Sequence, residues 1–351
     1  MEKTLAIGLM SGTSLDGLDI CYSSFHKNKN NIWHFEIIKA ETLEYSKKWE
    51  KKLREAIHLK SEDLLALHSE YGFYLGECVQ KFIKQNNLKK IDVIASHGHT
   101  VFHQPERKFT LQIGDGRAIK IINQIPTVYG FRSQDVLMNG NGAPLVPIGD
   151  ELLFSEYAAC LNIGGFSNIS LKENNQRIAF DICPVNIVLN DFAKKLGQNF
   201  DKNGELAKNG IVNEKALKQL NSLKYYSQKI PKSLGIEWVI KEVSPILKKL
   251  NPQEALATFT EHSAEKIAET LNHYQSENVL ITGGGAYNQF LIERIKAKTK
   301  TSIIIPNNDL VEYKEALVFA LMGVLRTQNE NNVIASATGS SEDHCSGIYI
   351  V

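Results

Sequence analysis

Hydroxyl and carboxylate side chains gather with glycine in residues 8–21, GLMSGTSLDGLDIC, between two apolar runs that we expect to be strands. A tight turn between strands needs only two or three turn-forming residues, with glycine supplying the positive φ. This segment holds more of them, namely Ser11, Gly12, Thr13, Ser14, Asp16 and Gly17. Such a composition is suited to wrapping a phosphate or a metal-bound phosphate.

Two further turns rich in glycine occur later in the chain, NIGGFSN at 162–168 and ITGGGAYN at 281–288. The second leads from an apolar run into a helical pattern, and the free N–H groups at a helix start favour an anion. The sequence has no GxxxxGK[ST] pattern, which excludes a P-loop. One glycine-rich turn is often only a sharp connection, but three of them in a chain with two lobes favour a nucleotide site.

Three aspartates close apolar runs: Asp115 in QIGDG, Asp135 in FRSQD and Asp181 in AFDICPVN. A turn cap or an ion pair is the simpler explanation for most aspartates at such positions. Asp181 differs because it directly follows the apolar run RIAF. We expect it at a strand end with little water around it, where a raised pKa suits a general base.

Three histidines lie close together in SHGHTVFH: His97, His99 and His103. On an extended strand His97 and His99 share a face, which suggests a metal site. However, no HExxH pattern or flanking carboxylate completes a zinc shell. We therefore favour a histidine that hydrogen-bonds in a sugar pocket.

The composition is that of a globular protein. The chain has 351 residues, of which 43% are hydrophobic and 23% charged, and its net charge is +1. This length favours two domains with a cleft between them. The balance of charge argues against a surface for nucleic acid or anionic lipid, and no apolar run is long enough for a signal peptide or a membrane span.

Five cysteines are spread along the chain without a CxxC pair: Cys21, Cys78, Cys160, Cys183 and Cys345. An odd and dispersed set argues against both a disulfide framework and a structural zinc site. We expect a soluble protein in a reducing cytoplasm.

The elements that must position these residues form a pattern that occurs twice. Strand-like runs cover 4–10, 18–25 and 32–38, and a helical stripe follows over 61–87 with Ser61 as its N-cap. The first three runs read as an antiparallel meander.

Two more apolar runs, 91–98 and 110–116, each end in glycine plus a polar residue, which is where α/β folds place their ligands. The residues NGNGAPLVP at 139–147 are rich in glycine, proline and asparagine. We expect the chain to cross between domains there.

Strand-like runs resume at 157–171 and 177–186. A second long helix is expected over 251–274, with Asn251 as its cap and Pro252 at its first position. Strand, triple glycine and helix then follow in ENVLITGGGAYNQFLIERI. This repetition predicts two similar α/β halves facing one another across a cleft.

Eight motifs stand in one order along the chain: GLMSGTSLDGLD, ASHGHTVFHQP, LQIGDG, FRSQDV with GAPLVP, LNIGGFSNIS, FDICPVN, ITGGGAYN and ASATGSSEDHCSGIYI. In this order they resemble the anhydro-N-acetylmuramic acid kinases, from residue 8 to residue 350. MSGTSLDGLD is the specific signature of the family, and GAPLVP supports it.

The resemblance implies an α/β fold of two actin-like (ribonuclease H-like) ATPase domains of the sugar kinase/heat-shock chaperone/actin superfamily, with a central cleft. The N-terminal domain would cover 1–130 plus about 335–351, and the C-terminal domain 131–334. The resemblance also implies ATP and Mg²⁺ as cofactors, a small-molecule sugar as partner, and a homodimer.

Members of this family use ATP and water to convert 1,6-anhydro-N-acetylmuramic acid into N-acetylmuramic acid 6-phosphate in cell-wall recycling. A carboxylate activates water to attack the anomeric carbon, and the 1,6-anhydro bond opens on the opposite side. The released O6 takes the γ-phosphoryl group.

By position, Asp181 matches the catalytic base of the family, and Asp16 or Asp181 would hold the Mg²⁺ between the β- and γ-phosphates. The residues implied in ATP binding are Gly12, Thr13, Ser14, Leu15, Asp16, Gly17, Leu18, Asp19, Gly164, Gly165, Gly283, Gly284, Gly285 and Asn288. The residues implied in the sugar pocket are His97, Arg132, Asp135 and Glu315.

This chain departs from the family pattern at several positions near these residues. The departures are Cys183 and Val185 for two glycines, His99 for a glutamine, Gly130 for an aspartate, Leu234 for a threonine and Ile236 for an arginine. Because valine cannot readily adopt the conformations of glycine, we expect the turn after Asp181 to be shaped differently. The preserved base and phosphate loops favour retained catalysis, whereas the choice of sugar stays open.

Two alternatives remain beside this kinase. One is a kinase for another anhydro sugar such as levoglucosan, whose pocket would need no partners for a lactyl carboxylate and an acetamido group. The other is an actin-like or chaperone-like ATPase that uses nucleotide to switch protein partners, which the lack of an acidic or flexible tail disfavours. A catalytically inactive relative is disfavoured by the intact Asp181.

Overall fold

The computed structural model describes residues 3–12 and 15–351, which form two compact units. The first unit is Met1–Phe154 with Tyr313–Val351, and the second is Ser155–Glu312. The chain therefore passes from one unit to the other after Phe154 and again after Glu312, and not at residues 139–147.

Residues 131–154 and 313–334, which the sequence assigned to the second domain, belong to the first unit. The reason is the close approach of helices α5 (Pro147–Leu153) and α13 (Asn308–Thr327) to their neighbours in this unit. A side chain at Gly8 would meet the carbonyl group of Ala316 in α13, and one at Gly149 in α5 would meet the side chain of Val318.

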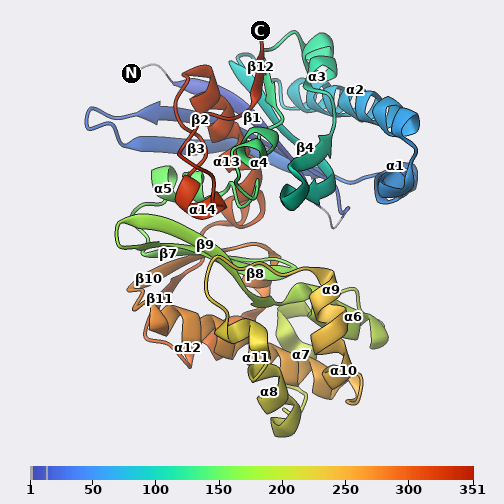
Figure 1. Cartoon of the computed structure of the whole chain (residues 1–351), viewed down its shortest axis with the longest axis vertical. Coiled ribbons are helices and arrows are strands. Elements are labelled where there is room, and N and C mark those ends of the chain that lie inside the picture. The colour runs from blue at the N-terminus through green and yellow to red at the C-terminus, as the bar shows by residue number, and fades with distance from the viewer. Residues whose placement is uncertain (1–2, 13–14) are drawn as a thin grey trace. The chain divides into compact units, whose positions relative to one another are not determined.

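The first unit is built on a sheet with the strand order β12-β6-β4-β1-β2-β3, in which β5 also pairs with β4 (Figure 1). The strands are β1 (Thr4–Ser11), β2 (Leu18–Lys27), β3 (Trp33–Leu43), β4 (Val93–Gln104), β5 (Phe109–Ile113), β6 (Thr127–Tyr129) and β12 (Ile348–Ile350). The expected antiparallel meander of β1, β2 and β3 is confirmed, and β1, β4 and β6 are parallel.

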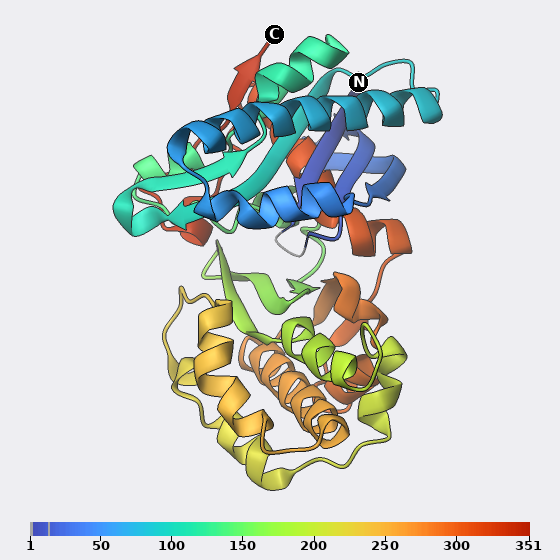
Figure 2. The same cartoon turned by 90° about the vertical axis from the view of Figure 1, so that its right-hand side faces the viewer.

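Alternate residues of β1 face different helices, as the period of two in a strand requires. Ile7 and Leu9 join a buried cluster with Tyr71 and Leu75 of α2 (Ser61–Gln85), whereas Gly8 lies against α13. In Figure 2, α2 extends across one face of this sheet. The glycine allows α13 to approach the sheet more closely than any side chain would.

The other helices of the first unit are α1 (Lys47–Glu55), α3 (Gly116–Asn123), α4 (Ser133–Leu137) and α14 (Ala335–Thr338). The prediction of Ser61 as an N-cap is wrong by one position, because Lys60 is the extended residue that precedes α2. The helix includes Ser61, so the Ser61 side chain does not cap it.

Strand β4 is longer than the apolar run predicted. It continues past Gly98 to Gln104, although Gly98 has φ +75° and the pairing of β4 with β1 shifts register nearby. Only glycine adopts this φ without strain. The residues SHGHTVFH therefore lie inside a strand and not in a loop after one.

The second unit repeats the topology of the first, with the strand order β11-β10-β7-β8-β9. The strands are β7 (Ala159–Ile163), β8 (Phe166–Glu173), β9 (Gln176–Pro184), β10 (Asn278–Thr282) and β11 (Ser302–Ile304). As in the first unit, an antiparallel meander is followed by parallel strands, which gives the order 3-2-1-4-5. The two similar α/β halves predicted from the sequence are confirmed.

The helices of the second unit are α6 (Asn186–Lys195), α7 (Glu205–Lys208), α8 (Glu214–Asn221), α9 (Ile236–Trp238), α10 (Ser244–Leu247), α11 (Pro252–His273) and α12 (Gln289–Lys296). The long helix α11 is the one predicted, and the side chain of its N-cap Asn251 accepts from the N–H of Glu254, as expected. Phe259, Ile267 and Leu271 of α11 lie in the buried core of this unit.

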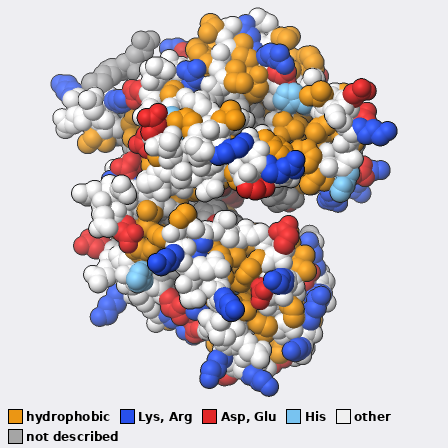
Figure 3. Space-filling model, viewed as in Figure 1, with side chains coloured by type: hydrophobic (Ala, Val, Ile, Leu, Met, Phe, Trp, Pro, Cys, Tyr) orange, Lys and Arg blue, Asp and Glu red, His pale blue; other side chains and the backbone are white. Residues whose placement is uncertain are grey.

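Among the described residues, no helix is both long enough and apolar enough to cross a membrane. In the part of the chain that the structure describes, none of the five cysteines forms a disulfide, and four of them are buried. On the face shown in Figure 3, the Lys and Arg side chains are scattered among Asp and Glu.

Candidate active site

All four residues predicted for the sugar pocket lie in the first unit. We call this set the arginine cluster; it consists of His97, Arg132, Asp135 and Glu315. Arg132 immediately precedes α4. Its Nε donates to Nε2 of His97 at 2.8 Å, and its Nη1 donates to the carbonyl oxygen of Gly142 at 2.6 Å. The guanidinium group is thus held from two sides.

The contact with Arg132 determines where the His97 proton lies. A guanidinium group can only donate, so Nε2 of His97 must accept. The ring proton is then on Nδ1, which donates to the carbonyl oxygen of Gly98 at 2.9 Å. Burial and the charge of Arg132 hold the pKa of His97 well below its usual range, so the ring is neutral.

Burial also affects the charged members of the arginine cluster. It lowers the pKa of Arg132 to about 10, against the opposing effects of Glu315 and Asp135. It raises the pKa of Glu315, which the positive charges of Arg132 and Lys314 oppose. At neutral pH the cluster therefore presents a cationic guanidinium group next to a carboxyl group that is easier to protonate than a free one.

Asp135 is fully buried, and both of its carboxylate oxygens accept hydrogen bonds from the protein itself. Oδ2 accepts from the N–H of Gly142 at 2.6 Å, and Oδ1 accepts from the hydroxyl of Thr338 at 2.7 Å. These bonds connect Asp135 with the loop whose carbonyl group holds Arg132, and a contact between Asp135 and the sugar stays a prediction.

Asp181 lies in the second unit and is the centre of a second group, the aspartate cluster of Asp181, Tyr225, Lys232 and Leu234. The prediction that it closes a strand is wrong, because β9 continues to Pro184. Its Oδ2 accepts from the N–H of Leu234 at 2.8 Å. Burial raises the pKa of Asp181, and the Leu234 N–H opposes this by stabilising the carboxylate, so the predicted direction of the pKa shift is confirmed.

The two residues that replace glycines after Asp181 are both buried. Val185 has φ −135°, so the turn here makes no use of the left-handed conformation that glycine would offer. The Cys183 thiol lies 3.3 Å from the hydroxyl of Ser167, and burial raises its pKa to about 12. This thiol is therefore protonated and packs as part of the core.

The structure brings together the two glycine-rich turns of the second unit, which follow the neighbouring parallel strands β7 and β10. Gly283 has φ +82°, and a side chain there would meet Oδ1 of Asn162 and the carbonyl group of Ile163. Gly284, by contrast, faces open space. Gly285 is also crowded by Ile163.

Other predicted ATP contacts of this unit already have partners in the protein. The carbonyl groups of Gly164 and Gly165 accept from the N–H groups of Asn186 and Val185 at 3.2 and 2.8 Å. Oδ1 of Asn288 accepts from the N–H of Leu291 at 3.0 Å and so caps α12. One of the free N–H groups expected at this helix start is therefore already satisfied.

The first glycine-rich turn lies between β1 and β2, and its residues Thr13 and Ser14 lie outside the described residues. Gly12 precedes them, and Leu15 follows them with φ +62°. Asp16 is exposed and Gly17 is buried, whereas Leu18 and Asp19 already belong to β2. The Asp19 carboxylate accepts from the hydroxyl of Thr42 in β3 at 2.6 Å.

A buried chain of hydroxyl groups supports the start of this turn, and sequence reasoning missed it. Tyr45 donates to Oγ of Ser11 at 2.8 Å and lies 2.6 Å from the hydroxyl of Tyr71, while Ser11 lies 3.0 Å from Nδ1 of His99. Burial lowers the pKa of His99 to about 4. Ser11, the last residue of β1, is therefore held by buried hydrogen bonds where the turn begins. The spacing of these four residues in the sequence does not predict that they are in contact.

The described residues contain no group of three or more His, Cys, Asp or Glu side chains arranged to hold a metal ion. His103, the third histidine of its motif, lies 3.0 Å from the hydroxyl of Thr110. A magnesium ion needs fewer protein ligands than such a group provides, because it keeps several waters and binds one or two carboxylates together with substrate phosphates. The exposed carboxylate of Asp16 fits that requirement.

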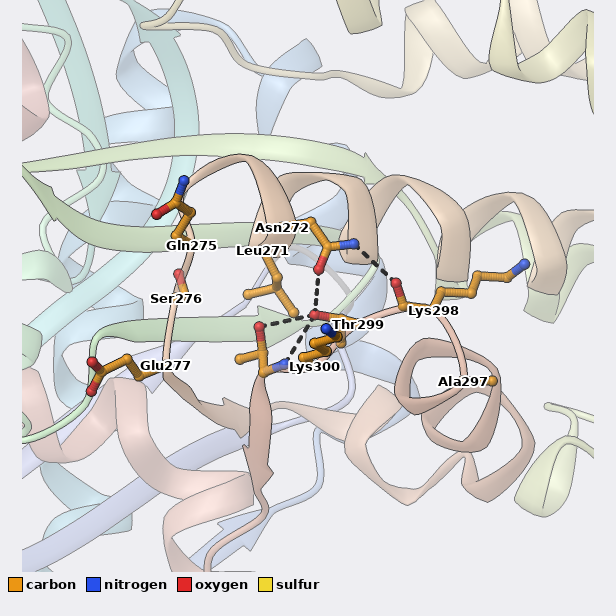
Figure 4. A pocket seen from close by; sticks show the side chains of 10 residues that line it. Leu271, Asn272, Gln275, Ser276, Glu277, Ala297, Lys298, Thr299 and Lys300 are labelled. Atoms are coloured by element: carbon orange, nitrogen blue, oxygen red, sulfur yellow. Dashed lines mark hydrogen bonds between the residues drawn. The ribbon is translucent and has the colours of Figure 1, made fainter.

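A cavity of about 600 Å³ opens at the end of β10 that is opposite to the triple glycine (Figure 4). Its lining includes Ser276 and Glu277, which precede β10, whereas the triple glycine follows that strand. A strand of five residues separates the two by roughly 17 Å. The side chain of Asn272 is engaged there with Lys298 and Thr299. This cavity is separate from the aspartate cluster and the glycine-rich turns.

Both units have an antiparallel meander of three strands followed by parallel strands, and glycine-rich turns follow β1, β7 and β10. The partly buried Asp181 lies on the third strand of the second unit. This arrangement defines a fold of two actin-like domains of the ATPase and sugar-kinase type. The family model of the anhydro-N-acetylmuramic acid kinases matches residues 4–350. The chain belongs to this family and is a kinase.

Individual relatives agree with the family model. The chain is 32% identical to the anhydro-N-acetylmuramic acid kinase of Caldanaerobacter subterraneus subsp. tengcongensis, over 97% of this chain and 95% of that protein. It is 33% identical to the enzyme of that name from Francisella tularensis subsp. novicida, over 97% and 96%. Among solved structures, an activator of 2-hydroxyisocaproyl-CoA dehydratase from Clostridium difficile matches 93% of this chain and 96% of its own, with a TM-score of 0.46 and 13% identity.

Proposed function

We propose that this chain is an ATP-dependent kinase that opens 1,6-anhydro-N-acetylmuramic acid with water and phosphorylates O6. The products are N-acetylmuramic acid 6-phosphate and ADP. Family membership and the names of the relatives support this substrate. The observation that carries the chemistry is the Asp181 carboxyl, which is partly buried and has a raised pKa.

Asp181 acts as the general base. It takes a proton from a water molecule while the water oxygen bonds to the anomeric carbon and the bond from that carbon to O6 breaks. O6 then bonds to the γ-phosphorus of ATP, the bond from that phosphorus to the β–γ bridging oxygen breaks, and ADP leaves. A base with a pKa nearer to neutrality is better suited to this transfer than an ordinary carboxylate.

The arginine cluster supports binding of the sugar. Arg132 offers a cation held rigidly by His97 and Gly142, and a rigid donor loses little entropy when it binds an anionic or polar group. Glu315 lies close enough to be influenced by the Arg132 charge and offers an acceptor to sugar hydroxyls.

The three glycine-rich turns are proposed to bind ATP, with Gly284 leaving the space that a phosphate group would use. Mg²⁺, when bound, neutralises charge on the transferring phosphates, and the exposed carboxylate of Asp16 would hold it. We further propose that the enzyme works in the cytoplasm as a homodimer in the recycling of cell-wall sugars.

The decisive experiment supplies purified enzyme with ATP, Mg²⁺ and the anhydro sugar in ¹⁸O-labelled water. We expect ADP and a 6-phosphate that carries one ¹⁸O atom at C1, and we expect the variant D181N to form neither. Levoglucosan and an assay without sugar are the two controls. Turnover of levoglucosan alone would assign a different anhydro sugar, and sugar-independent ATP hydrolysis would favour the partner-switching ATPase.

A further inference from the structure

An irregular segment between Tyr225 and α9 lies along the strand that carries Asp181. The main-chain N–H of Asp181 donates to the carbonyl oxygen of Lys232 at 3.1 Å. The N–H of Leu234 donates to Oδ2 of the Asp181 side chain at 2.8 Å. Lys232 and Leu234 thus contact the backbone and the side chain of one residue.

This segment is anchored to Asp181 by a third bond. The hydroxyl of Tyr225 donates to the carbonyl oxygen of Asp181 at 2.7 Å. The Lys232 ammonium lies 4.7 Å from the centre of the Tyr225 ring and donates to the Tyr225 carbonyl oxygen at 3.3 Å. The Tyr225 side chain is only 3% exposed. The Leu234 N–H is therefore held in place by the contacts of Tyr225 and Lys232, which precede it in the sequence.

The two oxygens of the Asp181 carboxylate differ as a result. Oδ2 has a main-chain donor, whereas within the described ranges no donor reaches Oδ1. An N–H that already points at one oxygen stabilises the charge there and leaves the lone pairs of the other oxygen available.

We infer that the main-chain N–H of Leu234 is a positioning group of the active site, which holds Oδ2 of Asp181 and leaves Oδ1 to take the proton from water. This inference rests on the proposed role of Asp181 as the base. The donor belongs to the main chain, so the contact does not depend on the side chain of Leu234.

The neighbouring titratable groups do not obscure the effect of this bond on the Asp181 pKa. Burial raises the pKa of Cys183 to about 12 and that of Tyr225 to well above its usual range, so both are neutral in the acid range. Burial lowers the pKa of Lys232 from an alkaline value, and its ammonium group stays charged there. The acid side of the pH profile therefore reports on Asp181.

The matched pair L234P and L234A tests the inference. Proline removes the N–H and alanine keeps it. Loss of a hydrogen bond to the charged form raises the pKa of the acid, and one bond to a carboxylate corresponds to a shift of about one unit. We expect the acid limb of kcat/KM to move up by about one pH unit in L234P and to stay unchanged in L234A. A limb at the same pH in both variants would overturn the inference.

A second measurement uses the unaltered enzyme and requires no substrate. The ¹H and ¹⁵N amide shifts of Leu234 are followed by NMR as the pH is varied, with D181N as the control. We expect them to titrate with Asp181 in the native protein and to remain constant in D181N. Leu234 amide shifts that do not change with pH in the native protein would refute the hydrogen bond. If these shifts do titrate but the D181N variant keeps full activity, the hydrogen bond stands and only the proposed function is refuted.

Discussion

The Nε of Arg132 donates to Nε2 of His97 across 2.8 Å, and this contact makes a buried, neutral histidine the support of a cation. The histidine proton is consequently on Nδ1, where the carbonyl oxygen of Gly98 accepts it. A second acceptor, the carbonyl oxygen of Gly142, holds the same guanidinium group from the loop that follows α4.

Asp135 holds this second acceptor in place, because its carboxylate accepts from the N–H of the same residue, Gly142. In D135N, an amide group has to replace a carboxylate that accepts from both Gly142 and Thr338. We expect a loss of about 2 kcal/mol in the free energy of unfolding and an increase of about tenfold in the KM for the sugar, because Arg132 loses its support. Steady-state kinetics and denaturant titration measure the two effects.

The matched control for D135N is T338V. It removes the hydroxyl donor to Oδ1 but keeps the bond from Gly142 to Oδ2. We expect a loss of about 1 kcal/mol in stability and an unchanged KM for the sugar. Equal effects of D135N and T338V on KM would show that Asp135 does not act through Gly142.

The buried histidines predict acid sensitivity of the fold. Burial lowers the pKa of His99 to about 4 and that of His262 to about 3, whereas the unfolded chain binds these protons near pH 6.5. The unfolded state therefore binds more protons as the pH falls from 6.5 toward 4, and the native state loses stability. Asp181 and Glu315, whose pKa values are raised, act in the opposite direction at lower pH.

The variant H99Q isolates one part of this effect, since glutamine does not titrate and its side-chain oxygen offers an acceptor to Ser11. Between pH 7 and pH 5 we expect H99Q to lose about 2 kcal/mol less stability than the native protein. Urea unfolding at the two pH values measures the difference. An identical loss in both proteins would mean that His99 is protonated in the folded state.

The triple glycine offers a pair of substitutions with opposite outcomes. Gly283 has φ +82° and no room for a side chain beside Asn162, whereas Gly284 faces open space. We expect G283A to cost about 2 kcal/mol of stability and G284A less than about 0.5 kcal/mol. Thermal unfolding of the two variants provides the comparison, and a G284A variant less stable than G283A would contradict it.

Much of the architecture could be read from periodicity and turn chemistry. The meander of the first unit, its repetition in the second and the cap of α11 by Asn251 follow from local patterns, since side-chain alternation and capping act over a few residues. The extent of β4 could not be read in this way. Gly98 looks like a strand end in the sequence, but the residues that follow it, from His99 to Gln104, pair with β5 and so continue the strand.

The sequence by itself determined the family, and it indicated the residues of the proposed site, above all Asp181, Arg132 and the three glycine-rich turns, because these are carried by motifs of a few adjacent residues. Tertiary structure alone decided how these residues are used. It brings Leu234 to Asp181 across 53 positions, His97 to Arg132 across 35 and Thr338 to Asp135 across 203. Contacts this distant in sequence depend on how strands and loops pack, and burial then shifts the pKa values of Asp181, His97 and Arg132.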